Sequence, residues 1–152
     1  MSLERVKVRI SRVSEKFSDI PLPSYMTQGS AGMDLFAAVE DFVVIEPMAV
    51  ILVPTNLRIE LPSGYEAQVR PRSGLAANHK IMMLNSPGTI DSDFRGEIKV
   101  ILFNIGDRPF TINRGDRIAQ MVVARYAYVE WEESNSIGDT VRGSGGFGST
   151  GK

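Results

Sequence analysis

Residues 56–70 read NLRIELPSGYEAQVR and contain two short runs in which apolar and polar residues alternate. A period of two places the apolar side chains of each run on one face, which is typical of strands half buried in a sheet. Between the runs, Pro62-Ser63-Gly64 is a turn signal. The residues expected to face inward are Leu57, Ile59 and Leu61 in the first run and Tyr65, Ala67 and Val69 in the second.

The same pattern recurs along the chain, beginning with Val6, Val8 and Ile10. Only one short helix is expected, over residues 74–78, with Ser73 as its N-cap. Many short strands separated by turns predict an all-β sandwich or barrel, with a jelly roll among the options. Further strand candidates are residues 42–45, 50–53, 81–84, 98–103, 110–112, 118–123 and 126–131.

The bulk composition narrows the classes of function. The 152 residues suffice for one domain with its own core. A formal net charge of −1 gives no overall attraction to nucleic acid or anionic membranes, so any phosphate must be held locally. The absence of cysteine excludes disulfides, zinc thiolates and cysteine nucleophiles. The amino terminus lacks a signal-peptide core, and a cytoplasmic protein without nucleic-acid or membrane partners is expected.

The last residues of the chain differ from the rest. Residues 134–152 are small and polar, and the final ten contain five glycines. Such a segment cannot bury enough apolar surface to order itself. A folded domain over residues 1–133 followed by a flexible tail over 134–152 is therefore expected. The tail nevertheless carries Arg142 and Phe147, a cation and an aromatic ring that a mobile clamp over a nucleotide would need.

Three clusters could carry chemistry. Arg72-Ser73-Gly74 offers a guanidinium, a hydroxyl and free backbone N–H groups at a helix start, which suits phosphate. These three residues alone nevertheless favour an exposed arginine beside an ordinary helix cap, because any helix start offers the same donors. Residues 88–96 form an expected loop in which Asp91 could be a general base, a metal ligand or a turn former. Asp34, between apolar neighbours, either faces solvent or serves a cation from one side.

In order along the chain, these segments resemble the five motifs of the trimeric deoxyuridine triphosphatase (dUTPase) family. Each motif alone is weak evidence for the family, whereas five motifs in order at the expected intervals are specific evidence. The motifs extend from residue 31 to the end of the chain. The matching segments are residues 31–35 (AGMDL), 71–76 (PRSGLA), 85–96 (NSPGTIDSDFRG), 114–121 (RGDRIAQM) and 142–151 (RGSGGFGSTG).

The resemblance implies a fold and an activity. The fold is a distorted, β-clip-like jelly roll with one short helix, assembled as a homotrimer whose sites lie at subunit interfaces. The swapped C-terminal tail of one chain closes the site of a neighbour. The activity is Mg²⁺-dependent hydrolysis of dUTP to dUMP and pyrophosphate, which limits uracil incorporation into DNA and supplies dUMP for dTMP synthesis.

The resemblance also implies residue roles. Asp91 is the general base for a water that attacks the α-phosphorus, Gln120 lies near that phosphate and water, and Asp34 supports Mg²⁺ through bound water. The substrate-binding residues are Arg72, Ser73 and Gly74 for the phosphates; Asn85, Gly88, Thr89, Ile90 and Asp91 for uracil; Phe94 under deoxyribose; Lys99 as a weaker contact; Phe147 stacked on uracil; Arg142, Ser149 and Thr150 for the γ-phosphate; and Gly148 in the same motif.

One position departs from the family pattern. Phe94 stands where the family usually has tyrosine, whose ring packs under deoxyribose and leaves no room for a ribose 2′-hydroxyl. Phenylalanine keeps the flat face and the bulk, so exclusion of UTP is expected to survive. Only the hydrogen bond of the phenol is lost, typically about 0.5–1.5 kcal/mol.

Three other functions compete with this one. A dCTP deaminase, which shares the fold, would lack the tail motif and use a glutamate for deamination. A non-catalytic jelly-roll module that binds nucleotide or protein would be expected to lose the base or the phosphate-binding arginines, and neither is missing. A general nucleoside triphosphatase would not need residues that recognise uracil, such as Asn85 and the segment from Gly88 to Asp91. Measuring which products are released from different nucleotides would distinguish these three functions from dUTP hydrolysis.

Overall fold

The computed structural model describes residues 4–148 and 151 of the chain. Within them every strand pairing is antiparallel, and one α-helix and one 3-10 turn complete the secondary structure. The elements are β1 (Arg9–Arg12), η1 (Glu15–Phe17), β2 (Met33–Phe36), β3 (Phe42–Ile45), β4 (Val50–Pro54), β5 (Leu57–Glu60), β6 (Tyr65–Arg70), α1 (Ser73–His79), β7 (Ile81–Met83), β8 (Gly88–Ile90), β9 (Lys99–Asn104), β10 (Phe110–Asn113) and β11 (Arg117–Arg125). The predicted all-β class with one short helix is confirmed.

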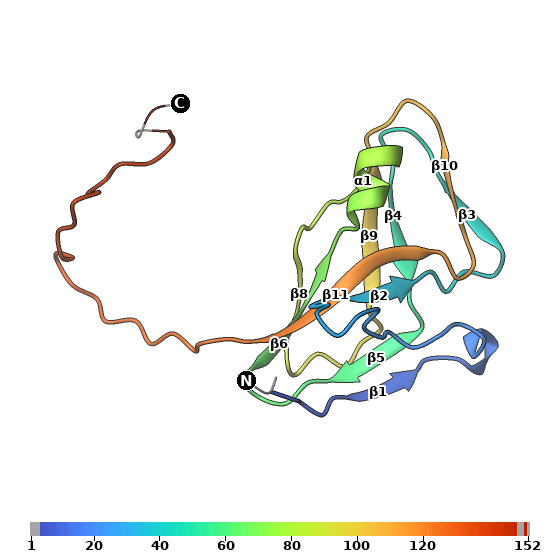
Figure 1. Cartoon of the computed structure of the whole chain (residues 1–152), viewed down its shortest axis with the longest axis horizontal. Coiled ribbons are helices and arrows are strands. Elements are labelled where there is room, and N and C mark those ends of the chain that lie inside the picture. Colours follow the sequence, from blue (N-terminus) through green and yellow to red (C-terminus); the bar gives the residue numbers. More distant parts are fainter. Residues whose placement is uncertain (1–3, 149–150, 152) are drawn as a thin grey trace.

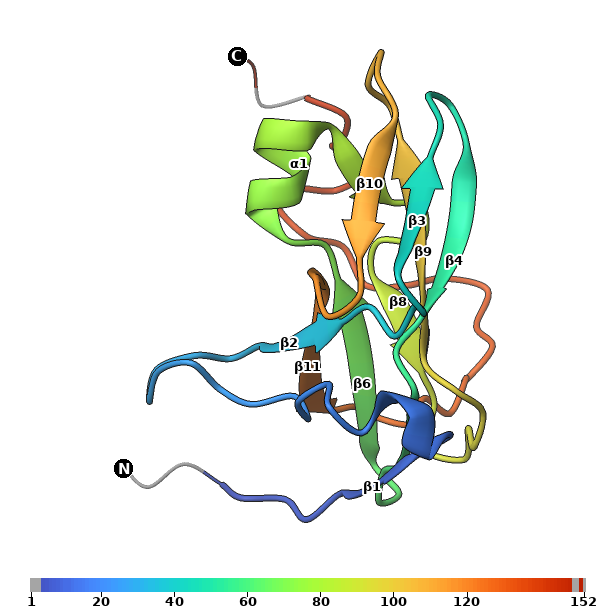
Figure 2. The same cartoon turned by 90° about the vertical axis from the view of Figure 1, so that its right-hand side faces the viewer.

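The strands form small sheets that wrap around one core (Figures 1 and 2). The largest sheet has the order β2-β11-β6-β8, and a second has the order β4-β9-β7; β1 pairs with β5, and β10 with β3. The turn after β5, with Gly64 at φ +85°, makes no hairpin, because β5 and β6 belong to different sheets. The chain thus crosses between layers at this turn.

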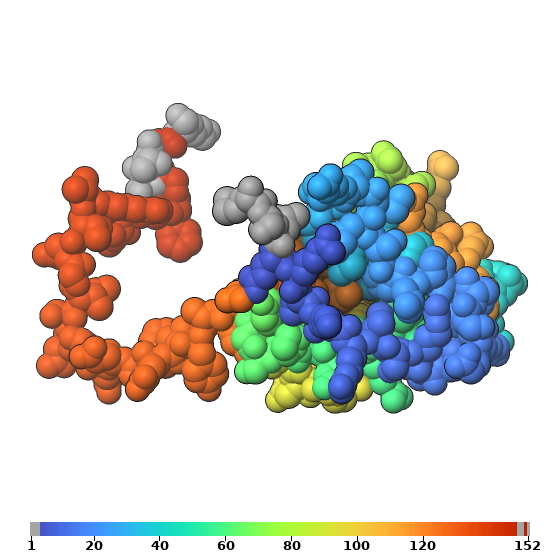
Figure 3. Space-filling view, turned by 60° about the horizontal axis from the view of Figure 1, so that its bottom comes forward, coloured from blue at the N-terminus to red at the C-terminus, as the bar shows by residue number. Residues whose placement is uncertain are grey.

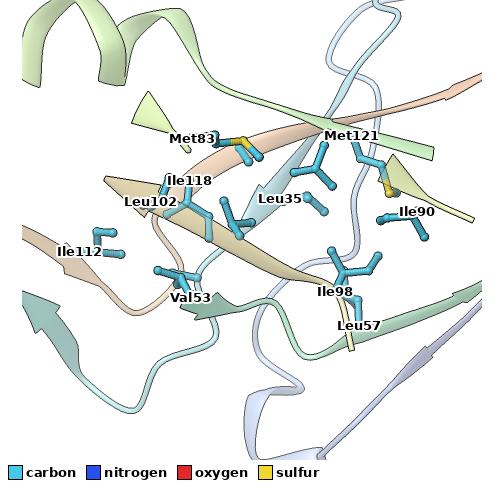
Figure 4. Close-up of a cluster of buried hydrophobic side chains, with 14 of the residues drawn as sticks. Leu35, Val53, Leu57, Met83, Ile90, Ile98, Leu102, Ile112, Ile118 and Met121 are labelled. Atoms are coloured by element: carbon cyan, nitrogen blue, oxygen red, sulfur yellow. The ribbon is translucent and has the colours of Figure 1, made fainter. Parts of the chain in front are cut away.

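The core is filled by the inward residues that the alternation predicts. Leu57, Ile59, Ala67 and Val69 are all buried, and they join aliphatic side chains from the other strands (Figure 4). Tyr65 is one exception, because its ring lies near the surface, where its hydroxyl accepts a hydrogen bond from Arg125. Val6 and Ile10, which the same alternation predicts to face inward, are also exposed. Two sheets facing one aliphatic core give the rigid frame on which the loops are mounted.

Four local predictions need correction. Residues 126–131, expected as a strand, pair with no strand in the part of the chain described. Ser73 is the first residue of α1 and not its cap; Arg72 is the N-cap and makes no side-chain capping bond. The expected loop 88–96 begins with the short strand β8, and the alternating run over residues 5–10 forms a strand only from Arg9 onward, as β1.

The sheet β4-β9-β7 has an exposed apolar face. Leu52 pairs with Ile101, and Phe103 with both Val50 and Met82, so these side chains share one face. Leu52 is 60% exposed although the opposite face of the same strands is buried core. Strands that are apolar on both faces are typical of sheets covered on both sides. We call Val50, Leu52, Met82, Leu84, Ile101 and Phe103 the apolar face.

The C-terminal tail leaves the body of the molecule after β11. Tyr126 N still donates a hydrogen bond to Gly64 O at 3.1 Å. Beyond it, Figure 3 shows the orange-to-red part of the chain projecting from the domain. Its apolar side chains are exposed, Trp131 at 88% and Phe147 at 113%. Its hydrogen bonds from residue 134 onward are local, such as Arg142 Nε to Gly145 O at 2.8 Å. No helix in the described residues is long and apolar enough to cross a membrane.

Candidate active site

One cluster forms around Asp34 and contains the predicted site residues Arg72 and Gln120; together with Arg117 we call it the phosphate cluster. The carboxylate of Asp34 is bound by Arg72 Nε at 3.2 Å and by Arg117 Nη1 at 3.5 Å, and its side chain is 17% exposed. Asp34 on β2 pairs with Gln120 on β11, which also pairs with Arg70 on β6, two residues before Arg72. Three strands thus bring two guanidinium groups to one carboxylate, leaving a net positive charge for an anion.

Gln120 is held in the same cluster. Its Nε2 donates a hydrogen bond to the carbonyl of Pro71 at 3.0 Å. Gly32 lies beneath it so closely that a Cβ on this glycine would be 2.5 Å from Gln120 Oε1. The orientation of the amide is therefore set by one hydrogen bond and by the missing side chain of Gly32.

The turn before β11 supports the cluster. Asp116 Oδ2 accepts from Asn113 N at 2.8 Å, and Gly115 adopts φ +79°. Arg114 reaches back to Asp19 at 2.6 Å, and this hydrogen bond holds the pKa of the Asp19 carboxyl below its ordinary value. The turn thereby fixes the start of β11 and the position of Arg117, whose contact with Asp34 sequence reasoning missed. Its signal was a second arginine in the motif of residues 114–121.

A second cluster forms a cavity of about 260 Å³ beside β8. The predicted nucleoside residues Asn85, Gly88–Asp91, Phe94 and Lys99 all line it. Gly88 and Ile90 are buried, whereas Asp91 and Phe94 are exposed at its opening. A Cβ on Gly88 would be 3.0 Å from Asn85 Nδ2, so the backbone and the amide lie in close contact. Backbone donors and acceptors beside a carboxylate suit a nucleobase and its sugar.

Some walls of the cavity were not foreseen from the sequence. They include Leu52, Met83, Glu97 and Ile101. Glu97 is engaged structurally, because its Oε1 accepts a hydrogen bond from Asn56 N at 2.9 Å. Leu52 and Ile101 belong to the apolar face, so the cavity opens at the border of that face. The alternation of apolar and polar residues predicts that such residues belong to strands, but it does not indicate which strands lie together around a cavity.

Asp34 and the nucleoside cavity lie at opposite edges of the sheet β2-β11-β6-β8, and Gln120 lies on β11 between them. Three strand spacings separate β2 from β8, about 14 Å. Along the strands, Asp34 lies level with Arg70, whereas Ile90 pairs with Ala67, a further offset of ~10 Å. Asp91 and Asp34 are therefore on the order of 15–20 Å apart, too far to act on one phosphate group from within one chain.

In the described part of the tail, the predicted residues Arg142, Phe147 and Gly148 contact neither cluster. Phe147 is fully exposed at φ +52°, and Arg142 bonds only within its own turn. Gly148 is likewise exposed. Ser149 and Thr150, the other two candidates of this motif, lie outside the described residues.

The phosphate cluster is compatible with a metal ion that is coordinated mainly by the phosphates of a bound nucleotide. Among the described residues no group of three or more His, Asp or Glu side chains could hold an ion. Asp34 is a single carboxylate, and both of its oxygens face arginines. Mg²⁺ keeps several waters and binds through one or two carboxylates plus substrate phosphates, so this sparse donor set is compatible with it.

Comparisons with known proteins agree with the geometry. A family profile described as dUTPase matches residues 18–151. The chain is 58% identical over 146 residues to a deoxyuridine 5′-triphosphate nucleotidohydrolase from Anaplasma marginale, covering 96% of this chain and 99% of that protein. It is 55% identical over 151 residues to the protein of the same name from Rickettsia conorii, covering 99% of each.

Solved structures share the fold. The dUTPase of Staphylococcus bacteriophage 80alpha with dUpNHpp superposes with a TM-score of 0.85 at 22% identity, covering 96% of this chain and 99% of that one. A dUTPase from phage phi11 of S. aureus, described as coordinating a structural Mg(II) ion, gives 0.75 at 20% identity, covering 86% and 98%. The predicted jelly-roll fold is thereby confirmed.

Proposed function

The chain belongs to the dUTPase family of nucleotide hydrolases, and on that basis we propose that it hydrolyses dUTP to dUMP and pyrophosphate. The observation that carries the proposal is the gathering of Asn85, Gly88–Asp91 and Phe94 around one cavity of about 260 Å³, with a carboxylate at its opening. By this activity the protein would keep uracil out of DNA and supply dUMP for dTMP synthesis.

The cavity would select the base and the sugar. Asn85 and the backbone from Gly88 to Asp91 would pair with the uracil edge, and the tight hairpin would reject the methyl group of thymine. Cytosine would present mismatched donors and acceptors. Phe94 would lie under deoxyribose and exclude a 2′-hydroxyl by its bulk, and Lys99 would make a further contact at the rim.

Asp91 would act as the general base. It would take a proton from a water whose oxygen attacks the α-phosphorus, while the bond from that phosphorus to the bridging oxygen breaks and pyrophosphate leaves. Gln120, anchored on Pro71, would orient the water and the attacked phosphate. Arg72, Ser73 and Gly74 would hold the phosphate chain, so that positioning and charge neutralisation provide most of the acceleration.

Mg²⁺ is proposed as the cofactor. When bound, it would neutralise charge on the triphosphate oxygens. Asp34 would support it through water, while Arg72 and Arg117 hold the orientation of the carboxylate. Because Asp34 already has two cationic partners, its share in holding the metal would be small beside that of the phosphates.

The active unit is proposed to be a homotrimer. Asp91 and the cluster around Asp34 are too far apart in one chain, so a site that uses both must combine residues of different subunits. The apolar face supports this, because a second chain packed on it would bury side chains such as Leu52, which is 60% exposed. The nucleoside cavity opens at this face, where a neighbour could bring phosphate-binding residues.

The tail would close the site of a neighbouring subunit. Projecting from the domain, it carries Arg142 and Phe147 without a partner in the core among the described residues. Phe147 would stack on uracil, and Arg142 with Gly148, Ser149 and Thr150 would bind the γ-phosphate. In this proposal the domain ends near residue 133, and the tail orders only when substrate is bound.

The test is pyrophosphate release from dUTP, dCTP, dTTP and UTP in parallel, with Mg²⁺ and with a chelator. Rapid Mg²⁺-dependent release from dUTP alone is expected. Tight dUTP binding without release would favour a non-catalytic module, ammonia from dCTP a deaminase, and release from all four nucleotides a general triphosphatase. Each of these three results would overturn the proposal.

A further inference from the structure

The ring of Phe94 rests directly against Gly96. A Cβ atom on Gly96 would lie 2.6 Å from Phe94 Cζ and 2.9 Å from Cε2. Carbon atoms in contact are normally about 3.5–4.0 Å apart. Any side chain at position 96 would therefore displace the tip of the ring by about 1 Å.

The backbone at Gly96 does not itself require glycine. Gly64 and Gly115 adopt positive φ angles that side chains rarely tolerate, but Gly96 is not among such positions. The space left by the missing side chain is therefore the property that the molecule uses here. That space is filled by the ring of a residue that lines the nucleoside cavity.

Steric contact matters more for a phenylalanine than for a tyrosine. Phe94 has no polar atom by which a hydrogen bond could fix the ring, and the residue is 43% exposed. Its backbone is held by Phe94 N to Asp91 O at 3.2 Å and by Arg95 Nη1 to Phe94 O at 3.0 Å. Neither bond restrains the ring itself, whereas the close contact with Gly96 limits where the ring tip lies.

We propose that Gly96 is a positioning residue for sugar recognition: its missing side chain provides the space in which the Phe94 ring lies at the cavity wall, where the ring excludes the 2′-hydroxyl of a ribonucleotide. The inference rests on the proposed function and extends it to a residue that would touch no substrate. Its signature is a loss of discrimination between dUTP and UTP, because a displaced ring no longer meets the sugar at the same place.

The experiment compares kcat/KM for dUTP and UTP in the wild type and in Gly96→Ala. The ratio of the two values should fall about 10- to 100-fold, since misplacement by ~1 Å near a reacting substrate can cost two orders of magnitude. Gly29→Ala is the matched control, because a Cβ there meets nothing within 4 Å, and its ratio should equal that of the wild type. An unchanged ratio in a folded Gly96→Ala protein would overturn the inference.

A double variant tests whether Gly96 acts through the ring. In a Phe94→Ala background, Gly96→Ala should change the ratio no further, because the atoms it would displace are gone. An equal additional fall in that background would contradict the inference. If Gly96→Ala alone fails to fold, recovery of the thermal transition in the double variant supports the contact, and no recovery contradicts it. Wild-type activity on dUTP tests the proposed function separately.

Discussion

Glycines adjoin several side chains of the proposed site, and each contact depends on the absence of a Cβ atom. None of the three residues concerned has the positive φ that would by itself call for glycine. Their neighbours come from different motifs, so the same kind of contact recurs beside the residues proposed to act on the base, the sugar and the phosphates. The pairs are Gly32 with Gln120, Gly88 with Asn85, and Gly96 with Phe94.

Replacing Gly32 by alanine should impair catalysis more than substrate binding. The new Cβ would lie 2.5 Å from Gln120 Oε1, so the amide must leave its present position. Because Gln120 is proposed to orient the water and the attacked phosphate, kcat should fall about 10- to 100-fold with a smaller change in KM. Steady-state kinetics beside Gly29→Ala provide the measurement. A change in KM alone would place Gln120 in substrate binding only.

Replacing Asp91 by asparagine should separate binding from turnover. The amide keeps the shape of the side chain but cannot accept a proton, so dUTP binding should persist while turnover falls about 10²- to 10⁴-fold. Calorimetry with dUTP and single-turnover pyrophosphate release measure the two quantities. Weak binding with unchanged turnover of the bound substrate would show that Asp91 is a binding residue and not the base.

At the level of elements, alternation predicts strands well where one face is buried and the other is solvated. The runs around β5 and β6 are such cases. β8 has three residues, begins with Gly88 and lies between Pro87 and Asp91, so its pattern is indistinguishable from a loop. The candidate residues of the hairpin were predictable through their motif, whereas the partnership of Arg117 with Asp34 depends on the pairing of β2 with β11.

Residues 126–131 show the converse error. Tyr126, Tyr128 and Trp131 give the segment strand propensity, but a strand forms only where a partner edge is available. Among the described residues no such partner lies beside it, and Tyr128 is 93% exposed. Propensity thus identified a segment able to pair, without indicating whether the chain itself provides the partner.

Deleting residues 142–152 should leave the domain folded but greatly lower its catalytic activity. The tail makes only local hydrogen bonds from residue 134 onward in the described part, so the thermal midpoint and the oligomeric state should be unchanged. Loss of the proposed clamp should lower kcat/KM about 100-fold or more. Phe147→Ala in the full chain is the control and should lose part of that amount. An unfolded truncation would show that the tail belongs to the core.

At the scale of the whole molecule, the proposed site is divided: among the described residues of one chain, the residues around Asp34 and the nucleoside cavity would each form half of it. The sheet β2-β11-β6-β8 places Asp34 at one edge and the nucleoside cavity at the other. A rigid sheet cannot fold the two together, so assembly is the simplest way to unite them. The same assembly would cover the apolar face, and folding, association and activity would then depend on one set of contacts.

Mixed oligomers test this arrangement directly. Asp91→Asn chains and Arg72→Gln chains, each inactive alone, are refolded together in equal amounts. If every site takes Asp91 and Arg72 from different subunits, random assembly leaves about a quarter of the sites intact, and activity should return to that fraction of the wild type. Asp91→Asn mixed with Asn85→Ala is the control: both residues line the same cavity, so no site regains both and the mixture should stay inactive. No recovery in the first mixture would mean that both residues of a site come from one chain, and that the sheet must deform to bring them together.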